Sequence, residues 1–254
     1  MALEIKEQAE ISHPATTREA FEAVSWLSDA SPSTFDRLAT RSLLHRAPHG
    51  VQLFEQAEIP TFAHLVVAGT VELLAIRGKD ETFIELVRPG DLLLPAALLG
   101  NLPYLVRARV RDSAQLLLIQ ADAFREAVAS DHGFCLGVLA CQAAQFRRQM
   151  KAAKAIRLRS AEERLGGFLL SIAEAAHGAA SLRLPLEKRL IASQLGMSRE
   201  TLSRALPALK KFGLRVTGET LHVDDLAAAR GAFAYDPLID GPEPIKPLRP
   251  QRIP

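Results

Sequence analysis

The residues of this 254-residue chain whose types and spacing suit recognition chemistry lie in the segment SRETLSR, residues 198–204. If the segment is helical, Glu200 and Arg204 lie one turn apart on the same face. An arginine guanidinium can donate to guanine O6 and N7, and a glutamate carboxylate can accept from the N4 amine of cytosine. The pair is therefore suited to read neighbouring base pairs in a DNA major groove. The alternative without function is a solvated helix face whose charges fall at this spacing by chance.

The elements predicted around this segment favour the DNA-binding interpretation. Apolar residues at helical spacing predict a helix from about Leu186, which Gly196-Met197 then ends. Ser198 is a typical N-cap residue for a second helix, and residues 214–223 predict two short strands around Thr217-Gly218-Glu219. Helix, turn, helix and hairpin in this order predict a winged helix-turn-helix. The expected DNA contacts are Ser198, Arg199, Glu200, Ser203, Arg204 and Lys210.

Pro207 fits poorly in the second of these helices. It has no N–H to donate to the carbonyl of Ser203, and a proline inside a helix costs about 3 kcal/mol or kinks the helix. We expect the kink just beyond the face that reads bases.

The segment MSRETLSR resembles the recognition helix of the CRP/FNR superfamily of bacterial regulators. More weakly, the resemblance extends to about Arg230, and it implies a sensor β-roll, a dimer helix and a winged helix that bind double-stranded DNA and act with RNA polymerase. Glu200 and Arg204 match both branches of the family, Ser203 is the FNR-like choice and Arg199 the choice of the cyclic-AMP receptor branch. Because Arg199 can equally well contact phosphate, we give Ser203 more weight and expect an FNR-like palindrome of TTGAT and ATCAA.

The composition indicates one or two globular domains with real cores, since 48% of the residues are hydrophobic and 24% are charged. The net charge of +2 does not by itself point to a polyanionic partner, but basic residues gather in residues 147–164 and 183–215. Cys135 and Cys141 cannot form a disulfide framework. Since no apolar run reaches membrane-spanning length and MALEIKEQAE is unlike a signal peptide, we expect a cytoplasmic protein without a membrane partner.

Residues 43–119 contain short apolar runs separated by turn residues, which predicts an antiparallel β-roll or jelly roll. The runs are VQLF, AHLVVAG, VELLAIRG, TFIELVRPGD, YLVRARV and AQLLLI, with corners expected at Gly50, Gly69, Gly78 and Pro89-Gly90. Helical segments around Phe21 to Leu27 and after Ser31 predict an N-terminal cap on this roll. A cupin-like enzyme on a similar roll is the alternative, but its metal needs clustered histidines, and this chain has no His-x-His. We therefore do not expect an enzyme.

The resemblance also bears on what the roll binds. Cyclic-nucleotide sensors of this family carry a glutamate for the ribose and an arginine for the cyclic phosphate, and here Pro95 and Tyr104 or Leu105 occupy those positions. A buried phosphate without its arginine is very unfavourable, so cyclic AMP is not expected unless Arg107 or Arg109 substitutes from a neighbouring position. An FNR-type iron–sulfur cluster is not expected either, because it needs four thiolates and the chain has two cysteines.

What remains is an apolar pocket that includes Leu94, Leu98, Leu99 and Tyr104. The resemblance is closest to the dissimilatory nitrate respiration regulators, which sense nitric oxide through haem, and it implies haem as a candidate cofactor with a histidine as axial ligand. The candidate ligands are His13, His64 and His132. The alternative is a roll that binds no effector, in a regulator controlled by its abundance.

Residues 131–159 predict one long helix whose apolar residues alternate by three and four, as in a two-stranded coiled coil, and they therefore predict a homodimer. This seam consists of Leu136, Leu139, Ala143, Phe146, Met150 and Ala153. The expected fold is α+β, with a cap and β-roll sensor domain at 1–130, the dimerisation helix at 131–159 and the winged helix-turn-helix at 160–233. Residues 234–254 are rich in proline and are expected to be disordered.

Overall fold

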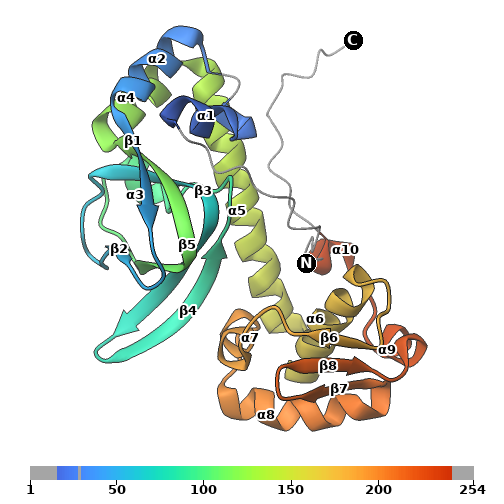
Figure 1. The fold of residues 1–254 in the computed structure, drawn as a ribbon. Coiled ribbons are helices and arrows are strands. Elements are labelled where there is room, and N and C mark those ends of the chain that lie inside the picture. Colours follow the sequence, from blue (N-terminus) through green and yellow to red (C-terminus); the bar gives the residue numbers. More distant parts are fainter. Residues whose placement is uncertain (1–15, 28–29, 242–254) are drawn as a thin grey trace, which may run out of the picture. The chain divides into compact units, whose positions relative to one another are not determined.

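The computed structural model describes residues 16–27 and 30–241, which form two compact units, residues 16–145 and 146–241 (Figure 1). The first unit contains two clusters of buried apolar residues, and the second unit has an apolar core of its own. In these described ranges no helix is both long and apolar enough to cross a membrane. The candidate ligand His13 lies outside the described residues.

The N-terminal cap is helical, as predicted. It consists of α1 (Thr17–Glu22), the 3₁₀ turn η1 (Ser25–Leu27) and α2 (Pro32–Thr40). Ser31 caps α2 by accepting the Thr34 N–H, and Pro32 occupies the first turn, where no helical N–H is required. Phe21 and Trp26 are buried, so the cap is part of the core of the first unit.

The predicted roll is an antiparallel sheet in the order β1-β5-β3-β4, with β2 also paired to β5. Its strands are β1 (Ser42–Ala47), β2 (Gln52–Phe54), β3 (Phe62–Arg77), β4 (Asp80–Val87) and β5 (Arg107–Gln120). The runs AHLVVAG and VELLAIRG, predicted as two strands, are both in β3. Likewise, β5 contains AQLLLI and the end of YLVRARV.

The corner predicted at Gly69 is wrong, because Gly69 lies inside β3. It has a φ of +74°, and the register between β3 and β5 shifts on either side of it, as in a β-bulge. A Cβ at this position would overlap the carbonyl oxygen of Ser113 on β5. Gly69 was therefore predicted as a turn, but it forms a bulge at which β3 bends and then continues.

The remaining helices of the first unit include the start of the long helix that the sequence predicts. They are α3 (Pro95–Gly100), α4 (Ala121–Ser130) and α5 (His132–Leu158). Asp131 caps α5 by accepting the Phe134 N–H at 2.9 Å, and it also accepts the N–H and hydroxyl of Ser31. Burial would raise the pKa of the Asp131 carboxyl, but these hydrogen bonds hold it well below its usual range. The cap, α4 and α5 are thereby fixed to one another.

The second unit is a winged helix-turn-helix, which confirms the α+β prediction. Its elements are α6 (Ala161–Ala175), β6 (Ser181–Arg183), α7 (Lys188–Gln194), α8 (Arg199–Ala208), η2 (Leu209–Phe212), β7 (Leu214–Thr217), β8 (Thr220–Val223), α9 (Leu226–Ala232) and α10 (Pro237–Asp240). Strands β7 and β8 form the predicted hairpin, and β6 adds a third strand that the sequence pattern did not indicate. The helix α6 begins with a capping box between Ser160 and Glu163.

The prediction of a disordered tail is wrong for residues 235–241. Asp236 caps the short helix α10 by accepting the Leu238 N–H at 2.8 Å, and Pro237 occupies its first turn. The carboxylate of Asp240 forms two hydrogen bonds with Arg159. Carboxylates in this segment therefore find specific partners despite its proline-rich composition. Residues 242–254 lie outside the described residues.

Gly137→Ala should destabilise the first unit. Gly137 is buried on α5, and a Cβ there would overlap the carbonyl oxygen of Trp26. Overpacking against backbone should lower the free energy of unfolding by about 1–3 kcal/mol. Urea unfolding followed by the fluorescence of Trp26, the only tryptophan of the chain, measures this.

The matched control is Gly231→Ala in α9, where nothing lies within 4 Å of the added Cβ. This control should leave the Trp26 transition unchanged. An equally unchanged midpoint in Gly137→Ala would show that the close approach of cap and helix is not required.

Candidate nucleic-acid interface

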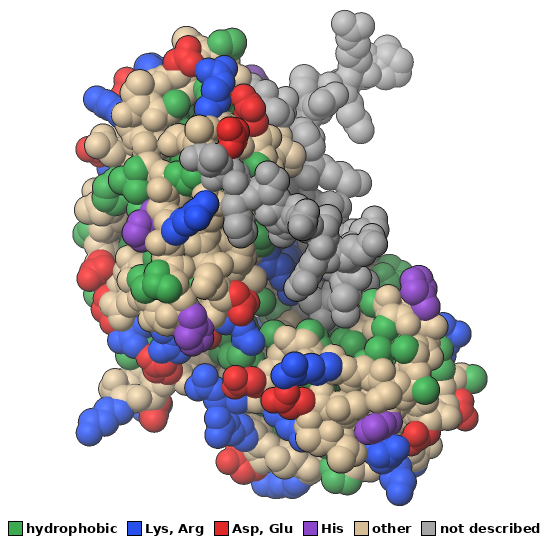
Figure 2. All heavy atoms as spheres, in the orientation of Figure 1, with side chains coloured by type: hydrophobic (Ala, Val, Ile, Leu, Met, Phe, Trp, Pro, Cys, Tyr) green, Lys and Arg blue, Asp and Glu red, His purple; other side chains and the backbone are tan. Residues whose placement is uncertain are grey.

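The helix α8 has one buried face and one exposed polar face. Leu202, Ala205 and Leu209 are buried in the core of the second unit. Ser198 caps the helix as predicted, since its hydroxyl oxygen accepts the Thr201 N–H at 3.1 Å. The predicted contacts on the opposite face are all exposed: Arg199, Glu200, Ser203 and Arg204, with Lys210 following in η2. Figure 2 shows Lys and Arg side chains over α7 and the start of α8.

Glu200 is held in its charged, hydrogen-bond-accepting form. Its own backbone N–H and the Ser198 hydroxyl lower its carboxyl pKa, and the nearby charges of Arg204 and Arg199 lower it further. At neutral pH the carboxylate can therefore only accept hydrogen bonds, as recognition of an amine group requires.

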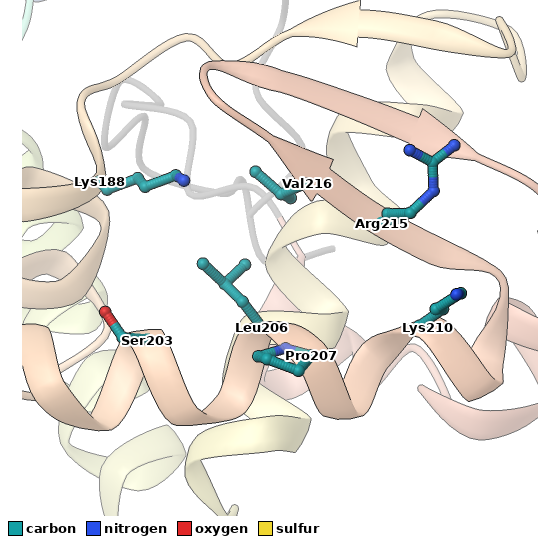
Figure 3. Close-up of a pocket in the computed structure, with 7 residues that line it drawn as sticks. All are labelled: Lys188, Ser203, Leu206, Pro207, Lys210, Arg215 and Val216. Carbon is teal, nitrogen blue, oxygen red and sulfur yellow. The ribbon is translucent and has the colours of Figure 1, made fainter.

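A hollow of about 350 Å³ separates α8 from the wing (Figure 3). It is lined by Lys188, Ser203, Leu206, Pro207, Lys210, Arg215 and Val216. Lys188 reaches across from the start of α7, whereas Ser203 and Leu206 project from α8 (Figure 3). Neither Lys188 nor Lys210 forms an ion pair with another described residue, while Arg215 makes long contacts of 3.4 Å with Asp224. Three cations around an apolar floor suit an anionic group such as a phosphate.

Lys188 and Arg215 did not appear among the residues predicted from the sequence. Both lie within the basic stretch 183–215, but the sequence of this stretch does not indicate which of its basic side chains point toward DNA. Ser203 and Lys210 were predicted, and the structure places both at this hollow.

Pro207 disturbs the helix where the sequence predicted. It is exposed in the last turn of α8, and after Ala208 the chain continues as the 3₁₀ turn η2. The missing N–H therefore coincides with the change of helix type, beyond Glu200 and Arg204.

The residues predicted for an effector pocket are divided between two packed clusters. Leu98 and Leu99 pack with the cap and α5, whereas Leu94 and Tyr104 pack with the inner side of the sheet. Tyr104 stacks on Phe54 with ring centroids 3.7 Å apart, and burial raises the pKa of its phenol above the usual range. The four side chains therefore do not face one common space in this structure.

The structure does not bring the histidines together. His132 is exposed at the first residue of α5, and His64 is buried on β3 with its ring 5.4 Å from that of Phe54. Burial lowers the pKa of His64 to about 4, so the ring is neutral, and its Nδ1 has no hydrogen-bond partner. A neutral nitrogen suits an axial ligand, but a porphyrin beside it would have to displace Phe54 and Tyr104. In this geometry the residues do not fit haem.

Arg107 and Arg109 are not available to replace the missing phosphate-binding arginine. On β5 they alternate with Ala108 and Val110, which are part of the core, so both guanidinium groups lie on the opposite side of the sheet. Their partners are three carboxylates. Arg107 bonds Glu55 at 2.6 and 2.9 Å and also pairs with Glu81, and Arg109 bonds Glu72 at 2.6 Å and Glu81 at 2.9 Å.

The predicted seam lies on the side of α5 away from the core. Phe134, Val138 and Cys141 bury one side of the helix. The other side leaves Leu139, Phe146 and Met150 with exposed fractions of 48, 60 and 53%. Ala143 is exposed as well, and Leu136 and Ala153 are half-buried. A row of large exposed apolar side chains on one helix is typical of a surface that binds a partner.

Comparison with known proteins finds two domain families. Residues 44–131 match the cyclic nucleotide-binding domain, and residues 163–228 match the Crp-like helix-turn-helix domain. An 85-residue segment is 29% identical to the potassium channel KAT3 of Arabidopsis thaliana, and it covers 34% of this chain but only 13% of the channel.

Solved structures similar to this chain include bacterial proteins with the same overall fold. One, assigned as a transcriptional regulator of the CRP/FNR family from Eubacterium rectale, is 16% identical with a TM-score of 0.67, covering 83% of this chain and 98% of that one. The c-di-GMP responsive global regulator CLP of Xanthomonas campestris is 18% identical with a TM-score of 0.61, covering 77% and 100%. DNR from Pseudomonas aeruginosa is 19% identical over 84% and 96%, but its TM-score of 0.45 carries no argument for the nitrate respiration branch.

Phe146→Glu should weaken self-association. If the seam joins two copies of α5, the substitution places like charges across an apolar contact. The side chain is 60% exposed in one copy, so the fold of the chain itself should be retained. Sedimentation equilibrium of both proteins measures the change, with circular dichroism as the folding check. An undiminished dimer would show that the seam is assigned to the wrong residues.

Proposed function

We propose that this chain is a regulator of the CRP/FNR type, because it pairs a cyclic nucleotide-binding domain with a Crp-like helix-turn-helix domain, and that it is a homodimer that reads an FNR-like palindrome. The observation that carries the proposal is the exposed face of α8 beside the cationic hollow of the wing. Its partners are double-stranded DNA, a second copy of the chain and RNA polymerase.

Base reading is assigned to the first two turns of α8. Arg204 presents a guanidinium to guanine O6 and N7, and Glu200, ionised and one turn earlier, accepts from a cytosine amine. Ser203 stands beside them at the edge of the hollow, where its short side chain allows close approach of the DNA. Arg199 is at the N-terminus of the helix, a position suited to a phosphate contact.

The hollow gives the sugar-phosphate backbone a place between α8 and the wing. Lys188 and Lys210 have no competing carboxylate among the described residues, so a phosphate there gains two charge-assisted contacts without breaking an ion pair. Such contacts position the protein and make its affinity depend on salt, but they carry no sequence information.

The exposed side of α5 supports the dimer. A two-fold dimer places two recognition helices on half-sites about one helical turn apart on one face of the DNA. The palindromic site and the seam are therefore parts of the same proposal.

The sensor domain is proposed to respond to a ligand other than cyclic AMP. The position expected for the ribose-binding glutamate is Pro95, and the arginines nearest the expected phosphate site are paired with carboxylates outside the core. Sensing of a diatomic gas through haem stays a prediction that would require Phe54 and Tyr104 to move away from His64, and the alternative of a regulator controlled by its abundance also stays a prediction.

A selection of DNA sites on the purified dimer tests the reading function. TTGAT and ATCAA half-sites one helical turn apart are expected. Recovery of TGTGA half-sites would show that Arg199 governs the outer base, and recovery of no palindrome would remove the DNA-reading proposal.

Two variants separate reading from positioning. Arg204→Ala should lose roughly 1–3 kcal/mol per half-site and relax the preference at the guanine. Lys210→Ala should weaken all sequences alike and flatten the dependence of affinity on salt. Polarisation titrations at several salt concentrations measure both effects, and equal loss on cognate and scrambled sites in Arg204→Ala would contradict its assignment as a base contact.

Cyclic AMP should not bind to the sensor domain, and it should therefore not raise the affinity for operator DNA. A ligand can change this affinity only if it binds more tightly to one conformation of the regulator than to another. Isothermal titration calorimetry measures this, and micromolar binding would overturn the prediction. The haem prediction is tested by absorption spectra of protein reconstituted with haem. The absence of a stoichiometric Soret band would contradict it.

A further inference from the structure

The segment Phe233 to Gly241, which follows the matched helix-turn-helix domain, is fixed to the rest of the second unit at both ends. At its start, the Phe233 ring packs against Phe212 at 5.1 Å and occupies the space beside Gly166, where a Cβ would meet the ring. At its end, Gly241 accepts a hydrogen bond from Lys151 of α5, and Asp240 accepts one from Arg159, which directly follows α5. We call residues 233–241 the clasp.

Two lysines of α5 and Arg159, which directly follows α5, hold the clasp by three separate contacts. Arg159 donates to both carboxylate oxygens of Asp240 at 2.7 and 2.8 Å. Lys154 lies 3.5 Å from the Asp236 carboxylate, and Lys151 donates to the Gly241 carbonyl at 3.0 Å. The exposed fractions of the Arg159 and Asp240 side chains are only 16 and 20%, so water screens this ion pair weakly.

The charges of the pair are stabilised in the folded state. Burial would raise the carboxyl pKa of Asp240, but the hydrogen bonds from Arg159 and from the Asp236 N–H outweigh burial and leave the pKa lowered. The bidentate geometry fixes the direction of the guanidinium as well as its distance.

The same residue, Arg159, lies at the junction between α5 and α6. Its carbonyl accepts a 2.6 Å hydrogen bond from Arg164, whose Nε donates to the Leu195 carbonyl at 2.7 Å. Leu195 follows α7 and directly precedes the turn to α8. The side chain of Ile156 also fills the space beside Gly196 in that turn. Contacts therefore run from the clasp through the end of α5 to the start of the recognition helix.

We propose that the clasp locks the junction at residues 159–160 in one geometry and so fixes the direction of α8 relative to the end of α5. Reorientation of the helix-turn-helix about this junction requires the Arg159 and Asp240 pair to open or to move with it. The expected effect on the affinity for DNA rests on the proposed function. A dimer with loose junctions must order its two recognition helices when it binds DNA, and this loss of conformational entropy lowers the affinity.

Hydrogen exchange on the full chain without DNA tests the clasp directly. Asp240→Asn keeps the shape of the side chain and removes its charge. Amides of residues 155–165 should exchange at least about tenfold faster, the factor for losing one charge-assisted hydrogen bond. The double variant Arg159→Asp with Asp240→Arg should restore slow exchange. Glu174→Gln, which removes the carboxylate of the more exposed pair with Arg230, is the control and should leave these amides unchanged.

Faster exchange confined to residues 235–241 would overturn the proposal, as would no change at all, because the clasp would then be only a surface attachment. Slow exchange of α7 and α8 in every variant shows that the domain remains folded. In polarisation titrations, Asp240→Asn should weaken binding to the palindrome without changing the salt slope, since no phosphate contact is removed. If wild-type protein binds no palindrome, the proposed function fails while the exchange result still decides the clasp.

Discussion

Burial of Phe134, Val138 and Cys141 along one side of α5 joins the N-terminal cap, α4 and the inner residues of the sheet into one core. Each large apolar side chain buried in this way contributes about 1.5–3 kcal/mol. Because this side of the helix is used by the core, the opposite side can remain bare, and the apolar residues there are free to meet another helix. The helix continues to Leu158, and Arg159, which binds Asp240 of the clasp, directly follows it.

Local signals in the sequence were sufficient for the helix-turn-helix. Gly196 adopts the left-handed conformation that ends the first helix, Ser198 caps the second, and the hairpin turns at Gly218 with a φ of +59°. Each of these signals acts within a few residues, so it can be recognised without knowing the fold. Gly69 has the same conformation inside a strand, and only its neighbour across the sheet distinguishes a bulge from a turn.

The features missed by sequence reasoning all depend on contacts between distant residues. The composition of residues 234–241 argues against folding, yet Asp240 is ordered by Arg159 more than 80 residues earlier. Lys188 and Arg215 meet Ser203 at the hollow only because the start of α7 and the wing both lie beside α8. Similarly, the alternation of Arg107 and Arg109 with core residues is visible in the sequence, but their carboxylate partners come from three other segments.

The bulge at Gly69 also bears on how the chain reaches this structure. Because β3 continues through it, one ladder with β5 extends from Phe62 paired with Gln120 to Leu74 paired with Arg107. Every pair in that ladder closes a long loop of chain, which is entropically unfavourable before the side chains can pack. The longest strand pairing of the second unit is the hairpin of the four-residue strands β7 and β8, which meet without closing a long loop. We therefore expect the DNA-reading unit to complete its folding well before the sensor sheet, whose slow step is the closure of this one ladder.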